Sequence, residues 1–135
     1  TTFHHFIAKC LFATKKSRPD IVVAVAFMTA HVKSPNQDDW KKFVRLIRYL
    51  RGTTKLSLTL SATSTIMPKW WVDGSHGVHP MMRGHTGGCL LLGKGMTNSI
   101  STKQKMNSRS STETEIIAVD DLMPLILWTN YFLEH

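Results

Sequence analysis

The sequence predicts an α+β fold in which helices precede a small antiparallel sheet and one more helix follows it. Apolar residues recur at helical spacing up to about residue 54. After Gly52 the period shortens to two, and glycine-rich segments separate short apolar runs. From Thr112 the helical spacing returns. We therefore expect a helical region over residues 1–54 and an α+β region over residues 55–135.

The first two helices are predicted from apolar spacing and from a proline. The first carries Phe3, Phe6, Ile7, Cys10 and Leu11 and ends near Lys15–Ser17. The second opens at Arg18–Asp20, because proline is tolerated in a first turn and an acidic residue suits the positive end of a helix. Residues 21–30 are apolar on all sides, which is typical of a buried helix. Their β-branched valines leave a strand as the alternative.

A third helix is predicted from Ser34–Asn36 to a glycine C-cap at Gly52. Its expected apolar stripe consists of Trp40, Phe43, Val44, Ile47 and Leu50. A basic face is formed by Lys41, Arg45 and Arg48, which are spaced i, i+4 and i+7. Two interpretations remain open for this face: plain solvation, or contacts with a phosphate backbone.

Short strands separated by turns are predicted for the middle of the chain. Leu56–Leu60 alternates apolar and polar residues and is the first expected strand, followed by a polar turn at Ser61–Thr65. The next is Ile66–Asp73, as an edge strand or one that starts after Pro68. The remaining expected segments are a loop at Gly74–Gly88, a strand at Cys89–Leu92, a turn at Gly93–Gly95, a strand at Thr97–Thr102 and a basic connection at Lys103–Arg109.

The last helix is expected to start with a capping box formed by Thr112 and Glu115. Its apolar stripe is predicted to be Ile116, Val119, Leu122, Met123, Ile126 and Leu127. Glu115 would head the face of this helix that packs on the sheet. Pro124 is expected to kink the helix or to end its first segment.

Charge and composition restrict the partners. Seventeen Lys and Arg residues against nine Asp and Glu residues give a net charge of +8, which favours a polyanion such as nucleic acid or an anionic membrane surface. The alternative is a basic protein without such a partner. The two cysteines lie far apart, so we expect a reducing, intracellular compartment. The longest apolar run, Ile21–Met28, is too short to cross a membrane, and the sequence shows no signal-peptide pattern. The chain starts at Thr1 and stops at His135 without a helix stop, so we expect a piece of a longer protein.

Two carboxylates are the candidate chemical groups. Asp73 lies where an apolar strand meets a glycine-rich segment, a position where a carboxylate often only caps a turn. A cation shared by Asp73 and Glu115 would satisfy both charges. A two-metal phosphodiester hydrolase usually needs three or four carboxylates. Asp120 and Asp121 point roughly 140° and 120° away from Glu115 on a regular helix. The pair alone is therefore an incomplete site.

The other candidate side chains are weaker. His76, His79 and His85 lack the spacing and the fourth ligand of a zinc site, so polar loop residues are the preferred interpretation. Lys103, Lys105 and Arg109 add positive charge near the carboxylates. Trp70 and Trp71 are expected to pack in the sheet, with base stacking as the alternative.

Several motifs in order resemble copia-type LTR retrotransposon polyproteins. The segments Ser17–Ile21, Asp39–Lys41 and Leu46–Thr53 resemble the C-terminal part of the reverse transcriptase. A second series of motifs resembles the ribonuclease H domain that follows the reverse transcriptase in these polyproteins. It consists of Asp73, Thr86–Gly88, Ser101–Gln104 and Ser110–Glu115. The resemblance implies a thumb and connection region followed by the first part of a ribonuclease H-like domain. It also implies hydrolysis of the RNA strand of RNA–DNA hybrids with Mg²⁺ or Mn²⁺, with Asp73 and Glu115 as catalytic metal ligands.

The sequence departs from this family at its catalytic positions. Ser75 stands where relatives have a second Asp, and histidines replace the Asp-rich loop that follows. The next catalytic Asp of the family lies on a strand after the last helix, beyond His135. We therefore expect weak or no nuclease activity from this chain. The expected location is intracellular, either a cytoplasmic virus-like particle or the nucleus. The alternative is a non-catalytic basic module that binds nucleic acid or a subunit. Expected partners are an RNA–DNA hybrid and the rest of the polyprotein, without a membrane, and an exposed sheet edge favours self-association.

Overall fold

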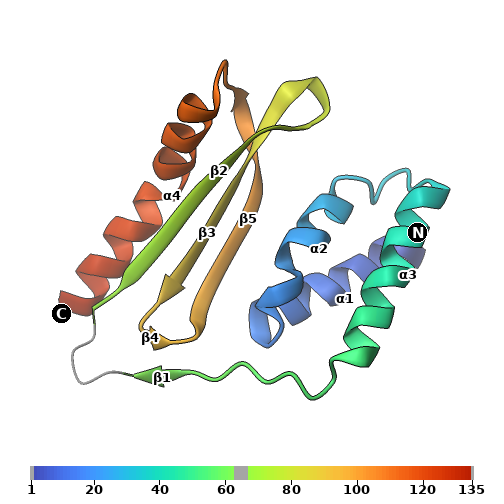
Figure 1. Ribbon diagram of the computed structural model, residues 1–135, viewed down its shortest axis with the longest axis horizontal. Helices are drawn as coiled ribbons and strands as arrows, with labels where there is room; N and C mark the ends of the chain where they lie inside the picture. Colours follow the sequence, from blue (N-terminus) through green and yellow to red (C-terminus); the bar gives the residue numbers. More distant parts are fainter. Residues whose placement is uncertain (1, 63–66, 135) are drawn as a thin grey trace. The chain divides into compact units, whose positions relative to one another are not determined.

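The computed structural model describes residues 2–62 and 67–134 and divides into two compact units, Thr1–Leu58 and Thr59–His135. Helices form the first unit, whereas strands followed by a long helix form the second (Figure 1). This order confirms the predicted α+β class, with helices first, an antiparallel sheet next and a last helix at the end.

The first unit consists of α1 (Thr2–Lys16), the short 3-10 helix η1 (Pro19–Ile21), α2 (Val22–Thr29) and α3 (Gln37–Gly52). Residues 22–29 are helical, so the strand alternative is wrong for them. One apolar cluster holds the unit together, and its buried members are Phe3, Ile7, Cys10, Ile21, Val25, Met28, Phe43 and Leu46.

A capping box fixes the start of α3. The Asn36 side chain accepts a hydrogen bond of 2.8 Å from the Asp39 N–H, and the Asp39 carboxylate accepts one of 3.0 Å from the Asn36 N–H. The buried face of α3 differs from the predicted stripe, because Phe43 and Leu46 are buried whereas Val44 and Ile47 are exposed. The helix is rotated toward α1, where the rings of Phe3 and Phe43 meet edge to face.

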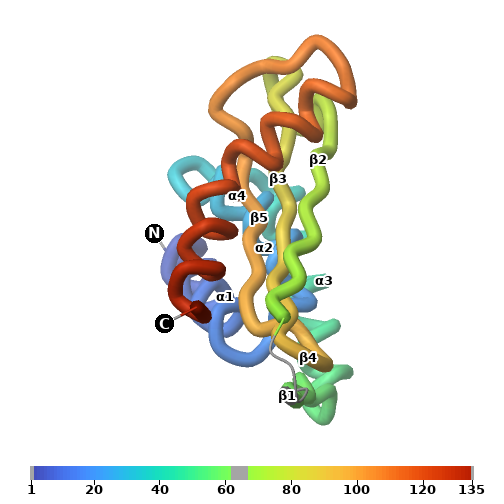
Figure 2. The backbone as a smooth tube through the Cα atoms, turned by 90° about the vertical axis from the view of Figure 1, so that its left-hand side faces the viewer, coloured from blue at the N-terminus to red at the C-terminus, as the bar shows by residue number. Residues whose placement is uncertain are grey.

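The second unit is a three-stranded antiparallel sheet with one helix on one of its faces (Figure 2). The strands β2 (Lys69–His79), β3 (Arg83–Leu91) and β5 (Met96–Asn107) lie in the order β2-β3-β5. The 3-10 helix η2 (Pro80–Met82) links β2 to β3. Two short strands, β1 (Ser61–Ala62) and β4 (Gly93–Lys94), pair with each other. The helix α4 (Ser111–Glu134) packs on β2 and β3.

The predicted strand at Leu56–Leu60 is wrong. This segment has no regular structure, and Leu56, Leu58 and Leu60 are exposed. An alternating pattern makes a strand only where a neighbouring strand pairs with it, and among the described residues the pairing with β4 begins only at Ser61. The predicted turn begins instead with the paired residues Ser61 and Ala62, and its residues 63–65 lie outside the described part of the chain.

The predicted loop at Gly74–Gly88 is also wrong, because most of it belongs to β2 and β3. The reversal is confined to Pro80–Met82, where Met81 and Met82 have φ of 61° and 57°. The glycines in this region serve close packing: a Cβ on Gly84 or on Gly88 would collide with Gln104 or with Leu122. The expected basic connection after Thr102 likewise continues β5 as far as Asn107.

The helix α4 runs without a break through Pro124, so the expectation that its first segment ends there is wrong. Its cap also differs from the prediction. The Ser110 hydroxyl accepts a hydrogen bond of 3.2 Å from the Glu113 N–H, and the Glu113 carboxylate accepts one of 2.6 Å from the Arg109 N–H. The start therefore lies two residues earlier than the predicted box. By length and composition α4 is also apolar enough to cross a membrane, a criterion that a helix packed on a sheet can meet as well.

Candidate functional site at the contact of β2 with α4

The site is built around an unusually close approach of a strand to a helix at Gly74. A Cβ on Gly74 would lie 2.6 Å from the carbonyl oxygen of Thr114 and 3.1 Å from the Cα of Glu115. No side chain fits at these distances, so only glycine allows α4 to approach β2 in this way. Asp73 precedes Gly74 in the strand, and the backbones of the two candidate carboxylate residues therefore lie close together.

The two carboxylates themselves are exposed. Asp73 pairs with Gly87 across the ladder to β3, and Glu115 lies in the first turn of α4. Because successive residues of a strand face opposite sides of the sheet, Asp73 lies on the face opposite to that of Gly74. The side chain of Asp73 therefore points away from the contact between β2 and α4, and the packing of α4 on the sheet buries neither Asp73 nor Glu115.

The prediction that Glu115 heads the packed face of α4 is wrong. The residues buried against the sheet are Thr114, Ala118 and Leu122, which are spaced i, i+4 and i+8. The stripe is therefore shifted by one position, and Glu115 and Val119 are exposed. The sequence misled because the apolar residues of α4 occupy several faces, so apolar spacing alone did not identify the face on the sheet.

Buried polar side chains fix the first turn of α4. The hydroxyl of Thr114 lies 2.5 Å from that of Ser108 and 3.0 Å from Nδ1 of His76. The same ring nitrogen lies 3.0 Å from the Ser108 hydroxyl. The three groups form a closed triangle that connects β2, the end of β5 and α4.

A second polar chain crosses from β5 to α4. The buried amide of Gln104 donates hydrogen bonds to the carbonyl oxygen of Thr114, at 2.9 Å, and to the hydroxyl of Thr86, at 3.1 Å. Thr86 in turn donates one of 2.8 Å to the Asp121 carboxylate. Each of these groups anchors the helix, because a buried polar group without its partner is costly. The sequence analysis did not predict this role. The alternation of Lys103, Gln104 and Lys105 could have indicated it, because in a strand with two outward-facing lysines the residue between them faces inward.

The histidines divide into two groups. His76 belongs to the Thr114 triangle, whereas Nε2 of His79 lies 2.8 Å from Nδ1 of His85. His85 also lies 2.7 Å from the hydroxyl of Ser101, and desolvation and then the neighbouring His79 lower its pKa. All three belong to strands, so their interpretation as loop residues is wrong. Over residues 2–62 and 67–134, no three His, Cys, Asp or Glu side chains are arranged to hold a metal ion.

The candidate basic residues lie on different units. Lys41, Arg45 and Arg48 line one hollow of about 450 Å³ on α3, together with Trp40 and Val44. The candidate basic residues of the second unit are Lys103, Lys105 and Arg109, and all three are exposed. Residues 1–58 contain eleven Lys and Arg residues and three Asp residues, so their net charge equals the +8 of the whole chain. Any attraction for a polyanion is therefore concentrated on the helical unit.

Comparisons with known proteins point to transposons. The chain is 27% identical over 95% of its length to a retrovirus-related Pol polyprotein from transposon TNT 1-94 of Nicotiana tabacum, of which it covers 10%. It is 30% identical over 84% of its length to an uncharacterised mitochondrial protein of Arabidopsis thaliana, of which it covers 48%. A Pol polyprotein from the Arabidopsis transposon RE2 is 29% identical over 83% of the chain, which covers 8% of it.

The chain spans less than half of the length of each of these three relatives. No protein-family model matches it, and no solved structure matches it. These similarities relate the chain to the Pol polyproteins of retrotransposons.

Proposed function

We propose that this chain is the part of a copia-type Pol polyprotein that contains the end of the reverse transcriptase and the first part of the ribonuclease H domain. The helical residues 1–54 would be the thumb and connection region, and residues 55–135 the partial nuclease domain. The observation that supports the proposal is the contact of Gly74 with Thr114 and Glu115, since it brings the backbones of Asp73 and Glu115 close together in the order of the family motif. The similarity to Pol polyproteins over most of the chain supports it as well.

The activity proposed for the complete domain is hydrolysis of the RNA strand of an RNA–DNA hybrid with Mg²⁺ or Mn²⁺. Hard cations of this kind take oxygen ligands, and in two-metal sites they stabilise the attacking and leaving oxygens. Asp73 and Glu115 offer two such ligands, with Ser75 in place of a second Asp. The described residues lack a third carboxylate at this position, so they meet the requirement of the metal site only in part. We therefore propose that this chain alone cleaves weakly or not at all.

The same proposal gives the basic residues a role in holding the hybrid. Lys41, Arg45 and Arg48 line one hollow on a rigid helix, where several cations on one side act together on a phosphate backbone. Lys103, Lys105 and Arg109 would add contacts near the carboxylates. The proposed partners are the hybrid, the remainder of the polyprotein and a second copy at the free edge of β2, in a cytoplasmic virus-like particle or in the nucleus.

A cleavage assay tests the proposal. The purified chain is incubated with an RNA–DNA hybrid labelled on the RNA strand, with Mg²⁺, with Mn²⁺ or with a chelator, beside its Asp73→Asn variant. We expect traces of metal-dependent cleavage at most, and the same background from the variant. Strong Mg²⁺-dependent cleavage that Asp73→Asn abolishes would show that two carboxylates suffice here and would overturn the proposal of an incomplete site.

A further inference from the structure

The side chains of Ser101, His85 and His79 form a chain of hydrogen bonds within the second unit. Nε2 of His85 lies 2.7 Å from the Ser101 hydroxyl, and Nδ1 of His85 lies 2.8 Å from Nε2 of His79. Both ring nitrogens of His85 are therefore engaged, one by a hydroxyl and the other by a second imidazole. A hydroxyl, a base that reaches it and a third group that orients the base make up the arrangement of a nucleophilic serine site.

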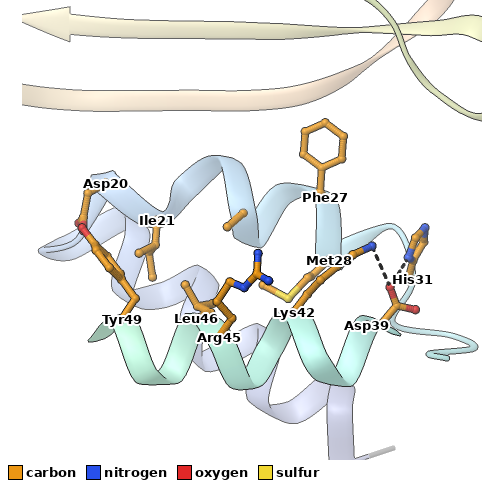
Figure 3. A pocket seen from close by; sticks show the side chains of 11 residues that line it. Asp20, Ile21, Phe27, Met28, His31, Asp39, Lys42, Arg45, Leu46 and Tyr49 are labelled. Carbon is orange, nitrogen blue, oxygen red and sulfur yellow. Dashed lines mark hydrogen bonds and ion pairs between the residues drawn. The ribbon is translucent and has the colours of Figure 1, made fainter. Parts of the chain in front are cut away.

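Two other histidine contacts have a different form. His31 lies beside the Asp39 carboxylate at the edge of the pocket between α2 and α3, so its partner is a charged group and not a hydroxyl (Figure 3). His76 meets the hydroxyls of Ser108 and Thr114 with one and the same ring nitrogen. By contrast, the central ring of the chain described above has a hydroxyl at one nitrogen and an orienting group at the other.

The sheet presents this chain on the face opposite α4. Ser101 on β5 pairs with Gly87 on β3, and His85 precedes Gly87 by two residues, so the side chains of the serine and the histidine project from one face. Thr86, which lies between His85 and Gly87, projects from the other face and contacts α4 there. His79 is the last residue of β2 and reaches the ring of His85 from that strand. Three strands therefore hold the chain in place without any residue of α4.

The glycine opposite Ser101 leaves room for a small acyl group. A Cβ on Gly87 would find its nearest atom, the carbonyl oxygen of Asp73, only 3.8 Å away. Gly87 and Ser101 are both partly exposed, so this space is open to solvent. The space above one glycine suits an acyl group of a few atoms, such as acetyl.

The surroundings of His85 favour the unprotonated ring that a general base requires. Desolvation and then the neighbouring His79 lower the pKa of His85, so its ring is mostly neutral at pH 7. With its single proton on Nδ1, this ring donates to Nε2 of His79. Nε2 of His85 is then the nitrogen that accepts the proton of the Ser101 hydroxyl.

The backbone supplies a donor for the negative charge that forms during acyl transfer. Among the described strands, β5 lies at an edge of the three-stranded sheet. Its ladder to β3 is regular at Ser101 and Thr102, and the N–H groups of successive residues point to opposite sides of a strand. One of these two N–H groups therefore points to the free edge, next to the nucleophile. A fixed N–H donor of this kind stabilises the oxyanion of a tetrahedral intermediate.

We propose that Ser101 is the nucleophile of an acyl-transfer site for small carboxylic esters, with His85 as the general base and His79 as a positioning residue. Oγ of Ser101 forms a bond to the carbonyl carbon of the ester while its proton passes to Nε2 of His85. The bond from that carbon to the alcohol oxygen then breaks, and the alcohol leaves with the proton. Water repeats the two steps on the acyl-serine and releases the carboxylic acid.

The proposed site uses none of the residues proposed for the metal ion or for the hybrid. It requires no metal ion, so its assays can be carried out in the presence of a chelator that stops metal-dependent cleavage of RNA. The failure of either proposal is therefore distinguishable from the failure of the other.

A serine-directed fluorophosphonate probe tests the nucleophile. The full chain is incubated with the probe in the presence of EDTA, and mass spectrometry after digestion locates the labelled residue. We expect one major adduct, on Ser101, and slower labelling when p-nitrophenyl acetate is present as a competing ester. We also expect the label to be lost when urea unfolds the chain. A major adduct on another residue, no adduct on Ser101, or equal labelling of the unfolded chain would overturn the proposal.

Matched variants separate the chemistry from a loss of folding. Ser101→Ala is expected to abolish labelling, whereas Ser99→Ala, two residues earlier in β5, retains it. His85→Gln is expected to slow labelling about a hundredfold, which is within the usual contribution of a general base. His5→Gln, at an exposed position of α1, is expected to leave the rate unchanged. Circular dichroism verifies that each variant is folded, and undiminished labelling of folded His85→Gln would contradict the proposal.

The role of His79 is tested by its effect on the ring of His85. His79→Phe removes the acceptor of the Nδ1–H and is expected to slow labelling about tenfold, the effect of one hydrogen bond. His79→Gln, whose amide oxygen accepts the same proton, is expected to restore most of the rate. In ¹⁵N NMR spectra the ring proton of His85 should be on Nδ1 in the unchanged chain. A ring proton on Nε2 there, or equal rates for the two variants of His79, would overturn these assignments.

Discussion

The carbonyl oxygen of Thr114 lies 2.6 Å from the point where a Cβ on Gly74 would stand, so the first turn of α4 rests directly on the backbone of β2. This contact fixes the position of Glu115 relative to Asp73. Thr114 itself is held by His76, Ser108 and Gln104, so the contact is reinforced from two strands. The candidate site therefore depends on packing that can be tested without any assay of activity.

Replacing Gly74 with alanine is predicted to lower the free energy of unfolding by about 1–3 kcal/mol, because the added methyl group forces the backbones of β2 and α4 apart. Urea denaturation followed by tryptophan fluorescence measures the change. Gly87→Ala is the matched control on β3, since the nearest atom to its Cβ is 3.8 Å away and no clash arises. Equal stability of the two variants would show that α4 can move away from β2 without lowering the free energy of unfolding.

Replacing Thr86 with valine is predicted to cost about 1–3 kcal/mol, because the buried amide of Gln104 and the carboxylate of Asp121 each lose a partner. The same denaturation experiment measures this loss. Thr102→Val provides the comparison: Thr102 pairs with Thr86 in the ladder, but its side chain is exposed. A variant of Thr86 that is as stable as that of Thr102 would contradict the anchoring role of the polar chain.

The stability of the helical unit is predicted to fall in acid through Asp39. The Asn36 N–H and then His31 lower the pKa of this carboxyl group, so the ionised form stabilises the fold. That contribution is complete above the ordinary carboxyl pKa of about 3.9 and is lost as pH falls through the lower folded-state value. Urea unfolding between pH 7 and pH 2 should show a weaker acid dependence for Asp39→Asn than for Asp38→Asn, in which the exposed carboxylate is removed instead. The same acid dependence in both variants would rule out this cause.

Binding of an RNA–DNA hybrid is predicted to depend on the basic side of α3. Replacing Lys41, Arg45 and Arg48 together with glutamine should weaken binding at low salt and lower the slope of log K against log salt by about 2–3, since each phosphate contact contributes about 0.9. Fluorescence anisotropy over a series of salt concentrations measures both quantities.

The control for that experiment changes the same number of charges on α1, at Lys9, Lys15 and Lys16, which are exposed. This control variant should lose less affinity for the hybrid and should keep most of the slope of log K against log salt. If both triple variants behave alike, net charge rather than the arrangement on α3 determines binding, and the residues Lys41, Arg45 and Arg48 lose their special role.

The helical unit was the most predictable part of the fold. The starts at Pro19 and Asn36 come from local chemistry, and the structure places helices there. The sheet was less predictable because its glycines could belong either to a loop or to strands that pack closely against a neighbour. Gly74, Gly84 and Gly88 lie in strands where α4 or its partners approach closely, and a sequence read alone takes such residues for a loop.

For the candidate site, the sequence predicted which residues are involved but not how they are arranged. Asp73 and Glu115 could be named from the ordered motifs, but the packed face of α4 was shifted by one residue. The roles of Thr86 and Gln104 depend on partners that lie 35 and 10 residues away along the chain, which spacing does not reveal.

The most direct test of the account is the position of a bound divalent ion in solution. Trace Mn²⁺ is added to the ¹⁵N-labelled chain, and the broadening of each amide resonance is recorded before and after competition with Mg²⁺. We predict weak broadening centred on Gly74 and the first turn of α4, which both Asp73→Asn and Glu115→Gln reduce and Asp120→Asn does not. Broadening that is absent there, or that survives in both carboxylate variants, would contradict the claim that these residues form half of a metal site.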